Sequence, residues 1–227
     1  MSRFPRYALL LVLASLAAFS ISGWFRANAA KALPDPKVDE FTAGAKSSET
    51  VVLAGGCFWG IQAVFEHVRG VVKATAGYSG GTIKNPEYEL VSTGTTGYAE
   101  SVEVVYDPSQ ITFGQLLKIF FSVAHDPTEL NRQGPDEGTQ YRSAIFYENP
   151  EQESIAREYV AQLTAARTFS EPIVTQIAPL KTFYRAETYH QDYLVKHPDN
   201  PYIVYNDLPK IANLKKQFPS LYVTYPR

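Results

Sequence analysis

The single cysteine of this chain stands in the sequence Gly55-Gly56-Cys57-Phe58-Trp59-Gly60. The apolar run Val51–Ala54 precedes it and a helical pattern follows, so we expect Cys57 on a tight turn between a strand and a helix. The free N–H groups at a helix N-terminus favour a thiolate. Most free cysteines are small buried core residues, but the flanking glycines and adjacent aromatic residues fit a reactive thiol better.

Two kinds of chemistry are open to such a thiol. A lone cysteine with a distant histidine is the pattern of a Cys-His acyl hydrolase, and the sequence leaves His125 and His190 open as its base. Alternatively, the thiolate attacks an electrophilic sulfur or oxygen and becomes a sulfenic acid, which requires an acid to protonate the departing oxygen. The candidates for that acid are Glu100, Asp136, Tyr88 and Tyr141. Taken singly, each is more typical of an ordinary surface acid or a packing tyrosine.

Other classes of site find little support. The four histidines do not pair with Cys57 at ligand spacing, so we expect no metal site. The glycine pairs at 55–56 and 80–81 fit neither a dinucleotide fingerprint nor a phosphate loop, and we expect no bound cofactor. A net charge of −2 gives no electrostatic reason to expect nucleic-acid binding.

Hydrophobic patterning predicts the elements that position these residues. Their order predicts a single α+β domain, a two-layer sandwich of a mixed β-sheet with helices on one side. The expected strands are 51–54, 71–78, 101–106, 140–147, 173–178 and 183–185. The expected helices are 57–69, 112–123, 150–167 and 208–217. The polar segments 79–100 and 125–138 are long for connections, which makes them functional candidates.

The first 29 residues have the form of an export signal. Arg3 and Arg6 precede the apolar stretch Ala8–Ala18, and Ala27-Asn28-Ala29 has the small-x-small form of a signal peptidase site. The alternative is an uncleaved membrane anchor, because the apolar stretch continues through residues 24–25. We therefore expect a periplasmic protein, or one anchored to the inner membrane.

The expected division of the chain is a signal peptide or anchor at 1–29, a flexible lead-in at 30–49 and a catalytic domain at 50–227. Exported domains commonly use paired cysteines, and this chain cannot form an internal disulfide. A lone thiol in an oxidising compartment is a liability unless it has a chemical role. Export therefore strengthens the case for chemistry at Cys57.

The segment around Cys57 resembles the signature of the type A peptide-methionine sulfoxide reductases, which act on the S epimer at sulfur. The similarity covers about Val51 to Leu221 in matching order. The further motifs that carry it are Gly77-Tyr78-Ser79-Gly80-Gly81, Thr96-Gly97-Tyr98-Ala99-Glu100, His125-Asp126-Pro127-Thr128, Asn131-Arg132-Gln133-Gly134, Gln140-Tyr141-Arg142-Ser143 and Ala186-Glu187-Thr188-Tyr189-His190-Gln191.

The resemblance implies a thiol-dependent reduction of methionine sulfoxide, both protein-bound and free, that repairs oxidative damage. Cys57 would attack the sulfoxide sulfur and remain as a sulfenic acid when methionine leaves. Phe58 and Trp59 would form the apolar pocket for the terminal methyl group of the substrate.

The resemblance also implies which residues handle the sulfoxide oxygen. Glu100 would protonate it, Tyr88 and Tyr141 would hydrogen-bond to it, and Asp136 would organise the polar side of the pocket. The physics supports these roles, because partial burial beside aromatic residues raises the pKa of a carboxyl and keeps it protonated at neutral pH.

Two features depart from the family pattern. Tyr98 stands where the family often has histidine, and we expect altered packing there without loss of activity. Many members also carry resolving cysteines near the C-terminus, whereas residues 198–227 contain none. The implied reductant is therefore an external thiol: a thioredoxin-like protein, a glutaredoxin-like protein with a small thiol, or a periplasmic dithiol protein.

The other expected partners are oxidised proteins and peptides, and we expect a monomer. One alternative function is a non-catalytic module that binds methionine sulfoxide. A Cys-His acyl hydrolase is a weaker alternative, because no recognisable oxyanion and base pattern surrounds Cys57.

Overall fold

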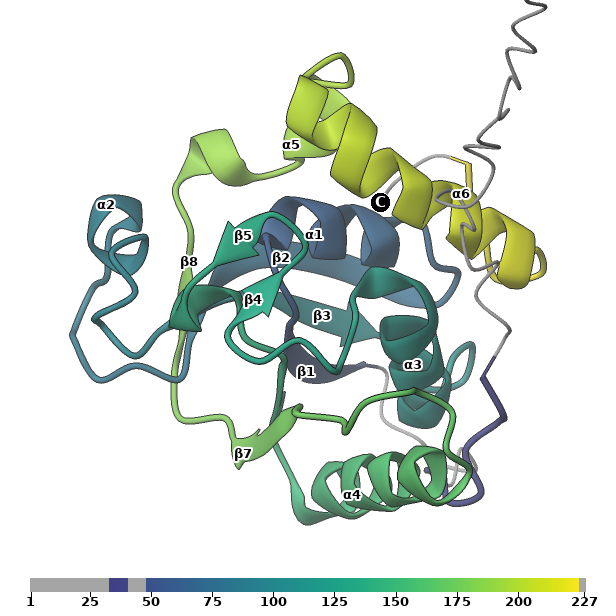
Figure 1. The fold of residues 1–227 in the computed structure, drawn as a ribbon. Coiled ribbons are helices and arrows are strands. Elements are labelled where there is room, and N and C mark those ends of the chain that lie inside the picture. Colours follow the sequence, from purple (N-terminus) through teal and green to yellow (C-terminus); the bar gives the residue numbers. More distant parts are fainter. Residues whose placement is uncertain (1–32, 41–47, 225–227) are drawn as a thin grey trace, which may run out of the picture.

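The computed structural model describes residues 33–40 and 48–224, so the expected signal segment 1–29 lies outside the described residues. A six-stranded sheet in the order β7-β6-β1-β3-β2-β8 forms the centre of the fold (Figure 1). Its strands are β1 (Glu49–Ala54), β2 (Val71–Ser79), β3 (Ala99–Tyr106), β6 (Ala144–Tyr147), β7 (Gln176–Pro179) and β8 (Phe183–Arg185). β6 and β7 are parallel and the other neighbours antiparallel, which confirms the predicted mixed sheet.

Helices pack on this sheet, which confirms the α+β class. The longer ones are α1 (Phe58–Glu66), α3 (Phe113–Ile119), α4 (Pro150–Ala165) and α6 (Leu208–Gln217), and the shorter ones α2 (Tyr88–Val91) and α5 (Tyr193–Lys196). π-helical turns cover Phe120–Ala124 and Ile203–Asp207, and 3₁₀ turns cover Thr139–Tyr141 and Thr188–His190. Two starts follow from local sequence: Thr112 and Gln115 form the predicted capping box of α3, and Asn149 caps α4.

The main core lies between the sheet and the helices. Apolar side chains of β1 and β3 meet the buried faces of α1, α3 and α4 in one continuous cluster. α1 lies along β2 and β3 with α6 beside it (Figure 1). A smaller cluster, which includes Val52, Ala54 and Phe146, lies apart from it.

The antiparallel pairing of β1 with β3 sets the position of the cysteine. Leu53, near the end of β1, pairs with Val102, near the start of β3. The chain that leaves β1 therefore emerges beside the first residues of β3, which include Glu100. The register of two strands thus brings Cys57 to Glu100, 43 positions further along the sequence.

Several predicted bounds differ from the structure. α1 ends at Glu66 rather than at residue 69, because Val68 forms a β-bridge with Tyr222 and the Arg69 N–H donates to the Leu221 carbonyl. The predicted strand 140–147 begins with a 3₁₀ turn, and β6 starts at residue 144. The polar segment 125–138 contains a hairpin of β4 (Arg132–Gln133) and β5 (Asp136–Glu137), and segment 79–100 contains α2.

Part of the expected flexible lead-in is packed against the domain. Leu33 is buried, and the carboxylate of Asp39 accepts hydrogen bonds from the Gly114 N–H and the Thr112 hydroxyl. Glu40 accepts from the Phe113 N–H at 2.7 Å. The prediction from low periodicity was wrong for residues 33–40, since polar caps on the N-terminus of α3 hold this segment without a repeating apolar pattern.

Within the described ranges, none of the helices has the length and apolar character needed to cross a bilayer.

Candidate functional site

Cys57 occupies the N-cap position of α1, as the sequence predicts. Gly56 has a φ of +95°, a conformation that residues with a side chain rarely adopt. A Cβ atom at this position would lie 2.5 Å from the Cγ of Gln133, so the hairpin segment covers the turn closely. The thiol is buried, with 8% of the residue exposed.

Glu100 joins the cysteine turn through the backbone. Its Oε2 accepts a hydrogen bond from the N–H of Phe58 at 3.0 Å, at the first position of α1. Burial, with a smaller effect from the charge of Asp136, raises the pKa of this carboxyl to about 8, against hydrogen bonds from Phe58 and the Cys57 thiol that lower it. Glu100 is therefore largely protonated at neutral pH and able to donate a proton.

The structure corrects one expectation about Cys57. The helix N-terminus acts in the expected direction, because a hydrogen bond from the Trp59 N–H lowers the pKa of the thiol. Burial, the largest effect, and the charges of Glu100 and Asp207 nevertheless raise this pKa well above its ordinary value. The resting site holds a neutral thiol, because desolvation and nearby carboxylates outweigh the helix terminus.

Aromatic side chains form one wall of the site. Phe58 is fully buried, and Trp59 lies parallel to Tyr193, with ring centroids 3.7 Å apart and an interplanar angle of 6°. Tyr202 meets Trp59 edge to face at 5.9 Å. Trp59, one of the two predicted pocket residues, is therefore supported by two tyrosines that were not singled out from the sequence.

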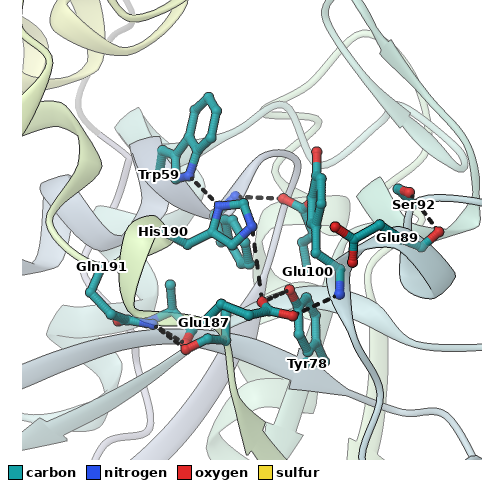
Figure 2. A network of polar contacts seen from close by, with 12 residues as sticks. Trp59, Tyr78, Glu89, Ser92, Glu100, Glu187, His190 and Gln191 are labelled. Carbon is teal, nitrogen blue, oxygen red and sulfur yellow. Dashed lines mark hydrogen bonds and ion pairs between the residues drawn. The ribbon is translucent and has the colours of Figure 1, made fainter.

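A polar network holds the Trp59 indole in place (Figure 2). The indole N–H donates to Nδ1 of His190 at 3.1 Å. Nε2 of the same ring lies 4.0 Å from a carboxylate oxygen of Glu187, which also accepts from the Tyr78 hydroxyl at 2.8 Å. Burial lowers the pKa of His190, so the ring stays neutral and Nδ1 remains an acceptor.

Tyr88, Tyr141 and Asp136 come together around Glu100 from separate elements. The charge of Glu100 acts on both phenols, and burial raises the pKa of Tyr88 to about 12 and that of Tyr141 still further. Tyr88 also packs against the ring of His190 at 4.5 Å. Asp136 accepts a hydrogen bond from the Tyr202 hydroxyl. Its charge acts on Glu100, Tyr88 and Tyr141, so the structure brings all seven predicted site residues into one neighbourhood.

The two histidines that the sequence left open as the base of a hydrolase are occupied elsewhere. His125 is buried, with Nδ1 3.1 Å from the Phe120 carbonyl and Nε2 2.7 Å from the Ser143 hydroxyl. Burial lowers its pKa to about 3. His190 holds Trp59, so both rings serve neighbours other than Cys57. In the described ranges, no three His, Cys, Asp or Glu side chains are grouped to hold a metal ion.

Tyr98 contacts residues other than those proposed to carry the chemistry. It is buried, its hydroxyl donates to the Ile83 carbonyl, and its ring meets Tyr184 edge to face at 5.9 Å. Several site residues were not predicted from the sequence: His190 as a partner of Trp59, Tyr193 and Tyr202 in the aromatic wall, and Asp207, whose carboxylate forms an ion pair with Lys210. The concentration of tyrosines in segment 184–205 was the available signal.

Comparison with known proteins gives one consistent result. The family described as peptide methionine sulfoxide reductase matches residues 49–221. A relative from Mesorhizobium japonicum, peptide methionine sulfoxide reductase MsrA 2, is 61% identical over 182 residues, which cover 80% of this chain and 93% of the relative. The MsrA 2 protein of Synechocystis is 47% identical over 203 residues, covering 88% and 95% of the two chains.

Solved structures agree. Methionine sulfoxide reductase A of Corynebacterium diphtheriae is 41% identical with a TM-score of 0.59, covering 69% of this chain and 78% of its own. Reduced Mxr1 from Saccharomyces cerevisiae is 34% identical with a TM-score of 0.61, covering 72% and 92%. From the family match and these relatives, this chain belongs to the peptide methionine sulfoxide reductase family, as an oxidoreductase of the MsrA type.

Proposed function

We propose that this chain reduces the S epimer of methionine sulfoxide through a sulfenic acid at Cys57, with Glu100 as the acid. The observation that carries the proposal is the contact of Glu100 with the cysteine turn. One carboxyl accepts from the Phe58 N–H, receives a hydrogen bond from the thiol and has a pKa of about 8. A protonated acid thus lies beside the only sulfur nucleophile of the chain.

The reaction balances with these two groups. The Cys57 sulfur attacks the sulfoxide sulfur as Glu100 protonates the sulfoxide oxygen, and the proton of the thiol restores Glu100. Loss of methionine then leaves the oxygen on the cysteine as a sulfenic acid. The substrate sulfur gains two electrons and the Cys57 sulfur loses two.

Three groups of residues shape the pocket around these two. The aromatic wall of Phe58 and Trp59 would receive the methyl group, because it is the apolar surface next to the thiol. Tyr88 and Tyr141 remain protonated across the physiological range and would donate hydrogen bonds to the sulfoxide oxygen. Asp136 would orient the Tyr202 hydroxyl on the polar side.

The second half of the cycle requires an outside thiol. With one cysteine in 227 residues, the sulfenic acid has no internal thiol to condense with. One external thiol forms a mixed disulfide and releases water, and a second thiol frees Cys57. A thioredoxin-like protein, a glutaredoxin with a small thiol, or a periplasmic dithiol protein would serve.

The substrates that fit this reaction are oxidised proteins and peptides and free methionine sulfoxide, so the role is repair of oxidative damage. The basic, apolar and small-residue pattern of residues 1–29 supports export to the periplasm, or anchoring to the inner membrane. The protein would act as a monomer.

A single-turnover assay tests the proposal. The protein, freed of reductant, is mixed separately with the S and R epimers of methionine sulfoxide, and methionine and a trapped sulfenic acid are measured. We expect about one methionine per protein from the S epimer, since each thiol completes only one reduction. The Cys57→Ser variant should keep its fold and form none. Methionine formed by that variant would overturn the nucleophile assignment, and binding without product would indicate a non-catalytic module.

A further inference from the structure

A buried ion pair between an aspartate and a lysine lies against the first turn of α1. Asp207, at the end of the π-helical turn Ile203–Asp207, is completely buried, and its Oδ1 lies 3.0 Å from Nζ of Lys210 on α6. The lysine side chain is 17% exposed. Neither residue belongs to the motifs that carry the family resemblance.

Gly60 allows the pair to approach the helix. A Cβ atom at Gly60 would lie 2.1 Å from Oδ1 of Asp207 and 2.7 Å from Nζ of Lys210, closer than side-chain atoms pack. Gly60 is three residues after Cys57, in the same helical turn. α1 has no acidic residue of its own in this turn, so Asp207 brings a carboxylate to it from a distant segment.

We propose that Lys210 is a positioning residue for the reductase reaction: held by Asp207 against Gly60, its ammonium group balances the carboxylates around Cys57 while the thiol gives up its proton. The inference rests on the proposed role of Cys57 as the nucleophile.

The charges that face Cys57 come from several elements. Glu100 on β3 and Asp207 raise the pKa of the thiol, and Lys210 is the cation that lowers it. Lys210 also lowers the pKa of Asp136 on β5. The remaining titratable groups that interact electrostatically with the thiol are the neutral phenols Tyr88, Tyr141 and Tyr202. Within the described residues, one ammonium group thus stands among three carboxyl groups.

Asp207 is a costly partner for an ion pair. Its Oδ2 is buried and makes no hydrogen bond with the described residues. An unsatisfied buried carboxylate oxygen costs stability, so such a group requires an explanation. Placing Lys210 against the helix turn that bears the thiol supplies one.

The pH dependence of Cys57 alkylation tests the inference directly, because the chain has a single cysteine and iodoacetamide therefore reports on one site. We expect Lys210→Met to slow alkylation at neutral pH about tenfold and to move the profile to higher pH. Asp207→Asn should accelerate alkylation and move the profile to lower pH, because the ammonium group is then unopposed. Single-turnover reduction should slow in parallel with Lys210→Met.

Opposite shifts separate an electrostatic role from a structural one, since loss of packing would change both variants in the same direction. Lys210→Arg should restore the wild-type profile, and Lys216→Met, an exposed position on the same helix, should leave it unchanged. Near-ultraviolet circular dichroism checks that each variant is folded, and Asp207→Asn carries the test alone if Lys210→Met does not fold. Shifts in one direction, or none, would overturn the inference. Turnover by Cys57→Ser would instead overturn the proposed function, while the alkylation profiles would still report on Lys210.

Discussion

The indole nitrogen of Trp59 donates a hydrogen bond to Nδ1 of His190 at 3.1 Å, and this contact joins two segments 131 positions apart. His190 is itself held by contacts with Glu187, Phe58 and Tyr88. The Trp59 side chain, which is proposed to receive the substrate methyl group, is therefore held in place by a residue that has no proposed contact with the substrate.

Removing the acceptor at His190 should loosen this wall. In His190→Phe the ring packing is retained but the Trp59 N–H loses its partner, so we expect KM to rise about tenfold, which corresponds to about 1.4 kcal/mol of binding free energy. His190→Asn places an oxygen near the position of Nδ1 and should restore most of the affinity. His197→Phe, which keeps an aromatic contact with Tyr193, is the matched control. Steady-state kinetics on the S epimer provides the measurement, and an unchanged KM in His190→Phe would contradict the positioning role.

Glu100→Gln should slow the reductive step. The amide keeps an acceptor for the Phe58 N–H but has no acidic proton, so we expect single-turnover methionine formation to fall about a hundredfold at neutral pH. The rate for the wild-type protein should also decline as pH rises through about 8, where the carboxyl loses its proton. Rapid-quench measurements across this range test the assignment. A variant that retains the wild-type rate would rule out Glu100 as the acid.

The same carboxyl should make stability depend on pH. Its pKa rises from 4.5 to about 8 on folding, so between these values the folded protein holds a proton that the unfolded chain has lost. The stabilising contribution is therefore complete below pH 4.5 and is lost as pH rises through about 8. The free energy of unfolding of the wild type, minus that of Glu100→Gln, should fall by on the order of 4 kcal/mol across this window. Urea unfolding at several pH values measures it, and a constant difference would mean that Glu100 is ionised when folded.

Tyr98 provides a contrast among the tyrosines. Tyr98→Phe removes the hydroxyl that donates to the Ile83 carbonyl, so we expect a loss of about 1 kcal/mol in the free energy of unfolding. Turnover should be unchanged, because this hydroxyl bonds to a backbone carbonyl and not to a residue of the thiol site. Tyr141→Phe should show the reverse pattern, with slower reduction and little change in stability. A large loss of turnover in Tyr98→Phe would show that the position is coupled to catalysis.

Much of the fold and part of the site could be predicted from local sequence patterns. The apolar run before Gly55, the helical spacing after Cys57 and the capping box at Thr112 each act within a few residues, so the pattern of one segment was enough to predict them. The roles of Cys57 and Glu100 came from the family resemblance, and the pairing of β1 with β3 explains how the two meet.

The remaining features depend on contacts between distant segments. The raised pKa of Cys57 is caused by burial and by Glu100 and Asp207, none of which the helix start reveals. The hairpin β4–β5 has two residues in each strand, too few for alternation to be visible. The packed segment 33–40 is held by polar caps rather than by periodic apolar residues, so its pattern resembled a linker.

The mass of the intact protein after one turnover shows whether Cys57 takes up the sulfoxide oxygen. The protein is mixed with methionine-S-sulfoxide in the absence of any thiol, and the mass of the protein and of the peptide that contains Cys57 are measured. We expect a gain of one oxygen atom on that peptide, one methionine released per protein, and return to the original mass when an external dithiol is added. Methionine formed without any change at Cys57, or an oxygen placed on another residue, would contradict this expectation.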